Sequence, residues 1–450
     1  MGTSSTSVTD TPDRTEVGSY FVANYPPFSV WTKEAVDMVA RPALALPPGD
    51  VPLGLYLHIP FCRKRCHFCY FRVYTDKNAA EVQGYLDVLA REWELYNEQR
   101  AIAGRPLKFV YFGGGTPSYL SVRQLESLVA RLDAVSSWRS ADEITFECEP
   151  GTLNESKLAA IRGLGVTRLS LGVENFDDRI LEVNGRAHRS PEIGRAYEYA
   201  RTLNFPQINI DLIAGMLGET DDNWRECVRK TIEMAPDSVT IYQMELPFNT
   251  TISRNLLKGG DAVAVGVPAV EGSVASWSTK RRWVAEAFEA LEAAGYHVGS
   301  AYTAVKSPST KFIYRDRLWQ GADMVGLGVA SFGYVNGVHM QNHDTNEAYT
   351  ASIEAGVLPL GRALRPTDEE RFIREFVLQL KLGSSRPSHY YHKYGINVLE
   401  RYRGQLDALA EDQLLTREGD RVLLTRAGLL RVDSLLPRFF KPEHRAVRYT

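Results

Sequence analysis

Short apolar runs alternate with longer amphipathic stretches along most of the chain. Six of these runs have the length of buried strands, and we expect strands at 52–59, 107–112, 144–148, 168–171, 207–213 and 238–243. Helical patterns separate them at 79–99, after Ser121, and at 177–184, 191–203 and 220–235. Strands that alternate with helices in this way form right-handed βαβ units and a parallel sheet. The pattern therefore predicts an α/β fold with a partial TIM-like (β/α)6 barrel.

We expect this barrel to occupy residues 51–350, with an extension before it and further strands at its end. A helix at 280–294 precedes two later apolar runs, at 296–301 and 324–329, which we expect to extend the sheet. Residues 1–50 form an extension rich in aromatic side chains, namely Tyr20, Phe21, Tyr25, Phe28 and Trp31. Such side chains normally pack against a core, so the extension is predicted to cover the barrel.

From residue 366 onward the order of the elements changes. The pattern predicts helices at 369–381 and 398–411, a hairpin of 414–417 and 421–424, and a last helix at 425–436. This order indicates a winged-helix-like α+β domain over 366–437, followed by a C-terminal tail at 438–450. Winged helices that bind DNA carry a basic stripe, and this stretch has none, so the sequence favours a packing or lid role.

Charge and cysteine content narrow the class of protein. The 52 basic and 55 acidic residues give a net charge of −3, which provides no general attraction to nucleic acid or to anionic membranes. No apolar run approaches the roughly 20 residues that span a bilayer, and the N-terminus lacks the apolar core of a secretory signal. Five cysteines, an odd number, argue against a disulfide framework. We therefore expect a cytoplasmic protein whose clustered thiols serve a metal or catalysis.

Three of the cysteines stand close together at the spacing C-x3-C-x2-C: Cys62, Cys66 and Cys69. Thiolates are ligands of iron–sulfur clusters and of zinc, and the charges of Arg63, Lys64 and Arg65 would favour the thiolate form. Three thiolates can hold three irons of a [4Fe–4S] cluster and leave the fourth open for catalysis. The loop follows the first strand, where a TIM-type barrel builds its active site. The alternative is a structural zinc site with His67 or Cys148 as fourth ligand.

The segment 56–62, which reads YLHIPFC, together with the two later cysteines resembles the radical SAM superfamily. Within it the chain is similar to the oxygen-independent coproporphyrinogen III oxidase (coproporphyrinogen dehydrogenase)-like family, from residue 52 through the C-terminal unit. The resemblance implies a [4Fe–4S] cluster on the three cysteines and S-adenosylmethionine (SAM) at the open iron, cleaved reductively to a 5′-deoxyadenosyl radical. It also implies a one-electron donor such as flavodoxin or ferredoxin, and it sets Tyr56 beside the cluster and SAM.

The glycine run after the second strand, with the threonine that follows, resembles the family motif that receives the amino group of SAM: Gly113, Gly114, Gly115 and Thr116. Glu147 resembles the carboxylate that holds the SAM ribose. Glu174, where the family usually has Gln, Arg186 and Asp211 stand at places that bind SAM, including a second molecule of it. Tyr56 and Glu174 are thus the catalytic candidates. Most of these residues fall on or just after successive strands, so we expect them on one face of the barrel.

Two departures from the family bear on the reaction. The decarboxylating members carry a fourth cysteine two residues after the third, where this chain has Phe71. The haem-chaperone members carry a His-Asn-x-x-Tyr-Trp motif, where this chain has Tyr314 to Trp319 without the histidine. Both departures set this chain apart from these two branches.

Three functions therefore stay open. The favoured one is that of the class C radical SAM methyltransferases and cyclopropanases, in which two SAM molecules serve methyl or methylene transfer to an sp² carbon. The alternatives are oxidative decarboxylation of coproporphyrinogen III in porphyrin and haem biosynthesis, and the non-enzymatic role of a haem chaperone. A small-molecule substrate is expected, with Tyr242, Gln243, Tyr302 and Trp319 as plausible lining.

Overall fold

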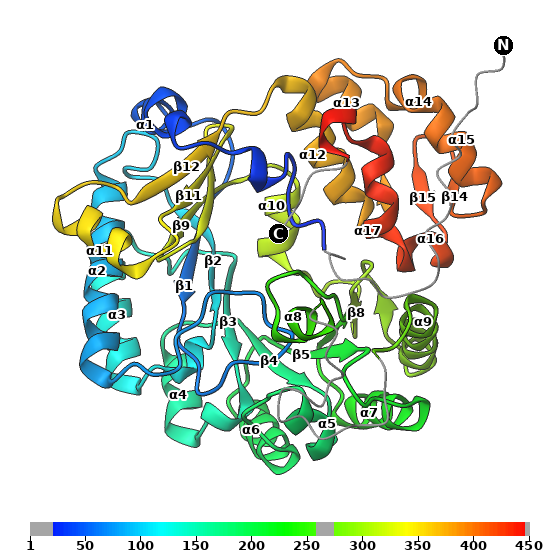
Figure 1. Cartoon of the computed structure of the whole chain (residues 1–450), viewed down its shortest axis with the longest axis horizontal. Helices are drawn as coiled ribbons and strands as arrows, with labels where there is room; N and C mark the ends of the chain where they lie inside the picture. Colours follow the sequence, from blue (N-terminus) through cyan, green and yellow to red (C-terminus); the bar gives the residue numbers. More distant parts are fainter. Residues whose placement is uncertain (1–20, 258–273, 446–450) are drawn as a thin grey trace.

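A twelve-stranded sheet forms the larger part of the molecule, which the computed structural model describes over residues 21–257 and 274–445 (Figure 1). Its centre is six parallel strands in sequence order: β1 Leu53–Ile59, β2 Leu107–Gly114, β3 Glu143–Cys148, β4 Arg168–Glu174, β5 Gln207–Ala214 and β6 Ser238–Gln243. All six are the strands predicted from the sequence. Their apolar runs are buried on both faces, which is the condition of a parallel sheet covered by helices.

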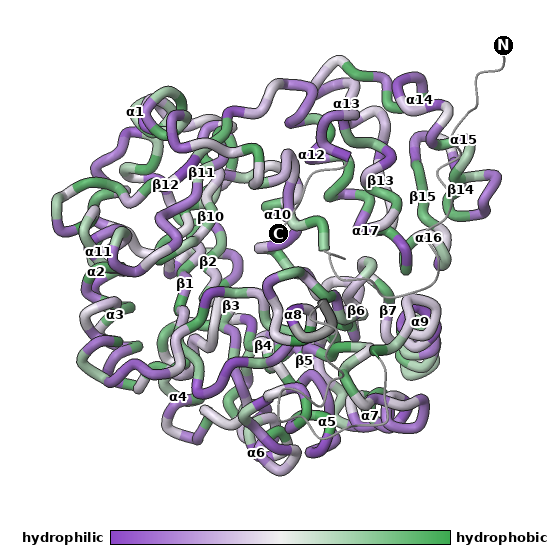
Figure 2. Tube along the Cα trace, in the orientation of Figure 1, coloured by the Kyte–Doolittle hydropathy of each residue, from purple (hydrophilic) through white to green (hydrophobic). Residues whose placement is uncertain are grey.

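Helices cover the outer face of the curved parallel sheet (Figure 1). They are α2 Ala79–Asn97, α3 Val122–Val135, α4 Glu155–Gly163, α5 Asp178–Val183, α6 Ser190–Thr202, α7 Asp221–Met234 and α9 Trp277–Ala293. Capping boxes begin α2, at Asn78 and Glu81, and α3, at Ser121 and Gln124. Hydrophobic positions concentrate in the central strands, whereas the helices are hydrophilic on their outer turns (Figure 2). In the described part of the chain no helix is long and apolar enough to cross a membrane.

Shorter strands extend the sheet at both edges. On one side β9 Asp323–Leu327 runs parallel to β1, and β10 Phe332–Val335, β11 Val338–Asn342 and β12 Leu360–Leu364 follow antiparallel. On the other side β8 Thr303–Val305 pairs with β6, and β7 His297–Val298 pairs with β8. The strand predicted over 296–301 is therefore only partly correct, because the chain reverses after β7 and Gly299 N–H bonds the Thr303 carbonyl at 2.8 Å.

The C-terminal part is a helical unit with a three-stranded sheet in the order β13-β15-β14. Its elements are α12 Asp368–Leu380, β13 Ser384–Ser385, α13 Pro387–Tyr394, α14 Val398–Arg401, α15 Arg403–Glu411, β14 Leu415–Arg417, β15 Val422–Leu424, α16 Arg426–Leu430 and α17 Val432–Leu435. The helices predicted over 398–411 and 425–436 are present, but each is divided in two by a single non-helical residue. Tyr402 and Arg431 leave helical geometry at the breaks, and the Tyr402 ring is buried in the core of this unit.

The described part of the N-terminal extension packs on the barrel, as predicted, only in its later residues 36–44, whereas its first residues pack in the C-terminal unit. Val22 and Tyr25 are fully buried in the C-terminal core, where the Tyr25 ring lies 4.8 Å from that of Phe440. Thr32 forms a β-bridge with Ala363. Short helices follow at Phe28–Val30, Val36–Ala40 and α1 Arg41–Ala45. The first twenty residues, including Tyr20, and the last five residues of the predicted tail lie outside the described residues.

Candidate functional site

A cavity of about 2240 Å³ lies between the carboxyl ends of the parallel strands and the C-terminal unit. The three cysteines line it, together with Gly114, Gly115, Thr116, Glu147, Glu174, Arg186 and Asp211. The C-terminal unit supplies the opposite wall, including Gln405, Leu414, Arg431, Asp433 and Arg438. The structure thus brings most of the predicted site residues to one cavity, at the end of the barrel where such folds build active sites.

The cysteine loop leaves β1 and is tied to its neighbours through the backbone. Cys62 N–H bonds the Tyr74 carbonyl and His67 N–H bonds the Asn184 carbonyl, each at 3.0 Å. The Thr116 hydroxyl donates to Cys62 Sγ at 3.3 Å. All three cysteines are free and half-buried, so their sulfurs face the cavity from a fixed loop.

The donor set fits an iron–sulfur cluster better than a zinc ion. The described residues hold no group of three or more Cys, His, Asp or Glu side chains that converge on one ion. In a [4Fe–4S] cluster each thiolate binds a different iron, so the three sulfurs need not converge on one point. The zinc alternative also loses a ligand atom, because His67 Nδ1 lies 2.9 Å from the Val183 carbonyl. Cys148, the other candidate, is buried at the end of β3.

Burial opposes the ionisation of two of the three thiols, those of Cys62 and Cys69. Burial raises the pKa of Cys62 to about 11 and that of Cys69 to about 12. The Arg63 guanidinium pairs with the Glu149 carboxylate at 2.9 Å and not with a cysteine sulfur. Arg65 does lower the pKa of Cys69, as expected for a neighbouring positive charge, but burial has the larger effect. Binding of a metal cluster to thiols of this kind releases their protons.

The turn after β2 requires glycine, because neighbouring atoms lie too close to leave room for a side chain. A Cβ atom at position 115 would lie 2.9 Å from the Ile59 carbonyl oxygen and 3.0 Å from Cys62 Sγ. At Gly114 the backbone φ is +109°, and a Cβ there would meet the His58 ring at 2.6 Å. These positions accept only glycine without a shift of the cysteine loop, so the turn and the loop form one unit.

Three carboxylates face the cavity from successive strands. They are Glu147 on β3, Glu174 at the end of β4 and Asp211 on β5. Burial raises the pKa of Glu147 and of Glu174 to about 7 each, and burial also raises that of Asp211. Glu174 adopts φ +64°, a left-handed conformation that is rare for a residue with a side chain and is often found at functional sites.

Arg186 lies between the cysteine loop and Glu174. Its Nη1 is 3.5 Å from Cys66 Sγ, its Nη2 donates to the Gly172 carbonyl at 2.6 Å, and Glu174 Oε1 is 3.6 Å from the same nitrogen. The guanidinium therefore joins a cluster ligand to a candidate SAM residue, which sequence reasoning did not foresee.

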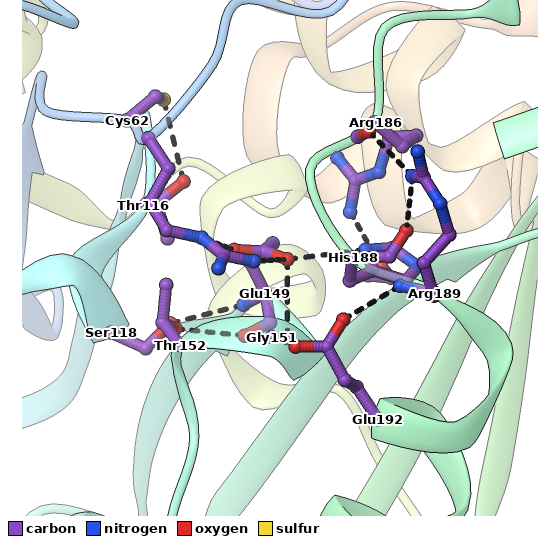
Figure 3. A network of polar contacts seen from close by, with 12 residues as sticks. Cys62, Thr116, Ser118, Glu149, Gly151, Thr152, Arg186, His188, Arg189 and Glu192 are labelled. Atoms are coloured by element: carbon purple, nitrogen blue, oxygen red, sulfur yellow. Dashed lines mark hydrogen bonds and ion pairs between the residues drawn. The ribbon is translucent and has the colours of Figure 1, made fainter. Parts of the chain in front are cut away.

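A polar network lies behind the cysteine loop (Figure 3). Glu149 receives the Arg63 guanidinium through two bonds, and His188 Nδ1 lies 3.3 Å from its Oε1. Burial raises the pKa of Glu149, but His188 and Arg63 outweigh burial and lower it to about 2. The Ser118 hydroxyl accepts from Glu149 N–H at 3.0 Å. The network fixes the loop to the ends of β3 and β4.

Two predicted site residues do not line the cavity, Tyr56 and Gly113. The Tyr56 hydroxyl is 3.2 Å from His58 Nδ1, and its ring stacks on Tyr111, which does line the cavity. Of the plausible lining residues, Tyr242, Gln243 and Tyr302 do line it, whereas Trp319 is not among them and is buried.

Tyr111 and Arg168 are site residues that sequence reasoning missed. Strand alternation could have found them, because every second residue of a strand points to the same face. Tyr111 shares one face of β2 with Gly113, and Arg168 shares one face of β4 with Ser170 and Gly172.

Comparisons with known proteins show which families this chain resembles. A sequence profile of the Radical SAM superfamily matches residues 56–231. An oxygen-independent coproporphyrinogen III oxidase from Synechocystis is 25% identical over 439 residues, which cover 92% of this chain and 91% of that protein. Heme chaperone HemW from Bacillus subtilis is 28% identical over 377 residues, covering 83% and 96%.

The fold is that of a solved coproporphyrinogen III oxidase (HemN) from Escherichia coli. The two structures match with a TM-score of 0.80 at 22% identity, covering 93% of this chain and 96% of that chain. These comparisons support the expected superfamily and fold. The methyl-transfer reaction that the sequence analysis favoured gains no support from them, so the finer reaction has to be argued separately.

Proposed function

We propose that this chain, which a profile of the Radical SAM superfamily matches over residues 56–231, is a radical SAM enzyme acting on a small molecule bound in the cavity between barrel and C-terminal unit. The observation that carries this proposal is the meeting of Cys62, Cys66 and Cys69 with Glu147, Glu174 and Asp211 around that one cavity. Bound there, a [4Fe–4S] cluster and SAM supply a strongly oxidising carbon radical when an external donor provides one electron.

The chain's own residues bind and orient the cofactor. The three thiolates hold the cluster, and the turn at Gly114 lets backbone groups approach the amino acid part of SAM. The Glu147 carboxylate accepts hydrogen bonds from ribose hydroxyls. Glu174 and Asp211 are the candidates for a second SAM molecule.

Aromatic side chains line part of the cavity and give it an apolar surface for a substrate. Tyr70, Phe71, Tyr242 and Phe248 belong to the exposed large hydrophobic side chains, and all four line the cavity. Elsewhere such residues are usually scattered singly over a surface, so their collection here favours a large unsaturated substrate and the exclusion of water.

The reaction we propose to test first is the oxidative decarboxylation of coproporphyrinogen III. The similarity over nearly the full chain to oxidases of this name supports it. Phe71, in place of the fourth cysteine, is the feature that speaks against it. Anaerobic incubation with coproporphyrinogen III, SAM and a reductant should yield protoporphyrin after oxidation. Unchanged coproporphyrinogen would exclude this substrate, and S-adenosylhomocysteine would point to methyl transfer.

Haem binding is the second candidate, because a haem chaperone is equally similar. The stretch that carries the haem motif in the family is here helix α10, Ile313–Trp319, with Tyr314 where the ligating histidine would stand. A haem titration that produces no Soret shift excludes this role, whereas a saturable shift at one haem per chain supports it.

A further inference from the structure

Tyr111 is bonded to the carboxylate that we assign to the SAM ribose. Its hydroxyl donates to Glu147 Oε1 at 2.5 Å across the neighbouring strands β2 and β3. The Gly114 backbone also lowers the pKa of Glu147. The bond from Tyr111 restricts the orientation of the carboxylate, and bonds to an ionised acceptor are the stronger kind.

Helix α10 holds the ring of Tyr111 in place. The Tyr314 ring lies 4.3 Å from that of Tyr111, centroid to centroid, and the Tyr56 ring stacks at 5.9 Å and 19°. Burial raises the pKa of Tyr111 well above its ordinary value, so its hydroxyl keeps the proton that it donates. Ring packing thus restricts the position of Tyr111, the hydrogen-bond donor, and the hydrogen bond in turn restricts the Glu147 carboxylate.

The same helix is fastened to the strand that carries Glu147. Glu143 on β3 accepts the N–H groups of Ile313 at 2.9 Å and Tyr314 at 3.0 Å, the first two residues of α10. Glu143 and Glu147 are four residues apart on a strand, so their side chains share one face. One face of β3 therefore holds both the helix that supports Tyr111 and the carboxylate that Tyr111 orients.

We propose that Tyr111, supported by Tyr314 of α10, is a positioning residue that holds the Glu147 carboxylate in the orientation that binds the ribose of SAM. This inference rests on the proposed function. It gives the stretch 314–319 a role in cofactor binding, although the haem-ligating histidine is missing there.

The charge state of Glu147 provides a readout that a merely structural role would not move. Burial raises the pKa of Glu147 to about 7, and the Tyr111 hydrogen bond lowers it. Asp211 on β5 acts in the raising direction and Arg168 on β4 in the lowering direction. The other titratable groups of the described residues that interact with Glu147 include Glu174, Cys148, Tyr56, Tyr70, Tyr242 and Tyr314. Loss of the Tyr111 hydroxyl should therefore raise the pKa of Glu147 further.

The experiment is equilibrium binding of SAM to the reconstituted full chain between pH 5.5 and about pH 9, a window around the Glu147 pKa of about 7. We compare the wild type with Tyr111→Phe, with Glu147→Gln, and with Tyr296→Phe as the matched control, which loses a buried hydroxyl that donates to the Pro236 carbonyl at 2.7 Å. Tyr111→Phe should weaken binding by about tenfold, the usual size for a lost bond to a charged group. Its pH midpoint should move upward. Tyr296→Phe lies outside the cavity lining and should bind as the wild type does. Glu147→Gln should lose the Glu147 step and keep only that of Glu174, whose pKa is also about 7.

The outcomes separate this inference from the proposed function. If the wild type does not bind SAM, the proposed function fails and the inference falls with it. If the wild type binds and Tyr111→Phe binds equally well, the inference alone is overturned. Weaker binding with an unshifted midpoint would also overturn it, because that result describes a general loss of structure.

Discussion

At the scale of single residues, close contacts between the glycine turn and the cysteine loop decide which side chains fit. Gly115 is the sharpest case, because its missing side chain leaves room for the Ile59 carbonyl and for Cys62 Sγ. The motif could be found in the sequence, since a glycine run after a strand is visible in any reading. The contact that makes glycine necessary could not be found, because it depends on where the cysteine loop folds back.

Gly115→Ala should displace the cysteine loop. Its Cβ would lie 2.9 Å from a backbone oxygen, so the backbone has to move, at a cost of about 1–3 kcal/mol. We expect less iron and sulfide per chain after anaerobic reconstitution and a lower unfolding midpoint. Gly194→Ala on α6 is the control, because nothing lies within 4 Å of its added Cβ, and it should stabilise the chain by about 0.5–1 kcal/mol. Iron uptake by Gly115→Ala equal to that of the wild type would contradict this reading.

At the scale of elements, buried polar groups connect pieces that the sequence pattern leaves unrelated. Glu92 on α2 is fully buried. It accepts bonds from Asn342 of β11 at 2.6 Å, from the Tyr349 hydroxyl of α11 Asn346–Glu354 at 2.6 Å and from Gly328 N–H at 2.8 Å. This one carboxyl thus joins a barrel helix to the extension of the sheet.

Glu92 should make stability fall as the pH rises. Burial raises its pKa in the folded chain from 4.5 to about 8. The folded chain then holds a proton that the unfolded chain releases, so the contribution is complete below the unfolded pKa and is lost as pH rises through the folded one. Urea unfolding at pH 5 and pH 8 measures the free energy of unfolding at each pH. Between these two pH values this free energy should fall less for Glu92→Gln than for the wild type, by on the order of a few kcal/mol. Equal losses in the two proteins would contradict the assignment.

The central strands could be predicted because each is a continuous apolar run buried on both faces. Strand β11 could not, since buried His339, Gln341 and Asn342 interrupt its apolar pattern. The helix break at Tyr402 was invisible for another reason: its ring is committed to a core made with Phe372, Phe376 and Phe439, far away in the sequence. For the site, the C-x3-C-x2-C spacing indicated the cysteines and the family resemblance indicated the carboxylates, whereas the Arg186 contact with Cys66 depends on a loop after α5.

At the scale of the whole molecule, one buried cation fastens the N-terminal extension to the C-terminal unit. Lys381 is fully buried at the end of α12. Its Nζ lies 2.8 Å from Asp433 of α17 and donates to the Val22 carbonyl at 2.6 Å. Asp433 also accepts from Val22 N–H and from the Tyr302 hydroxyl. We call the contacts of Lys381 and Asp433 with Val22 and Tyr302 the clasp. It lies in the wall of the cavity opposite the cysteines.

Lys381→Met should loosen the clasp, because it leaves Asp433 without its buried cation. Removal of one partner of a buried pair usually costs about 3–5 kcal/mol. We expect a lower unfolding free energy and faster hydrogen exchange over residues 21–32. The control is Arg438→Gln, whose ion pair with Asp412 at 3.7 Å is exposed and should contribute about 0–1 kcal/mol. Similar effects of the two substitutions would argue against a clasp.

The central claim is that the cysteine loop and the cavity beside it carry radical SAM chemistry. The most direct test is mass spectrometry of an anaerobic mixture of the reconstituted full chain, SAM and a strong reductant, with Cys62→Ala in parallel. We predict that 5′-deoxyadenosine forms with the wild type and is absent with Cys62→Ala. A wild-type protein that holds a full complement of iron and sulfide and still forms no 5′-deoxyadenosine would contradict the claim.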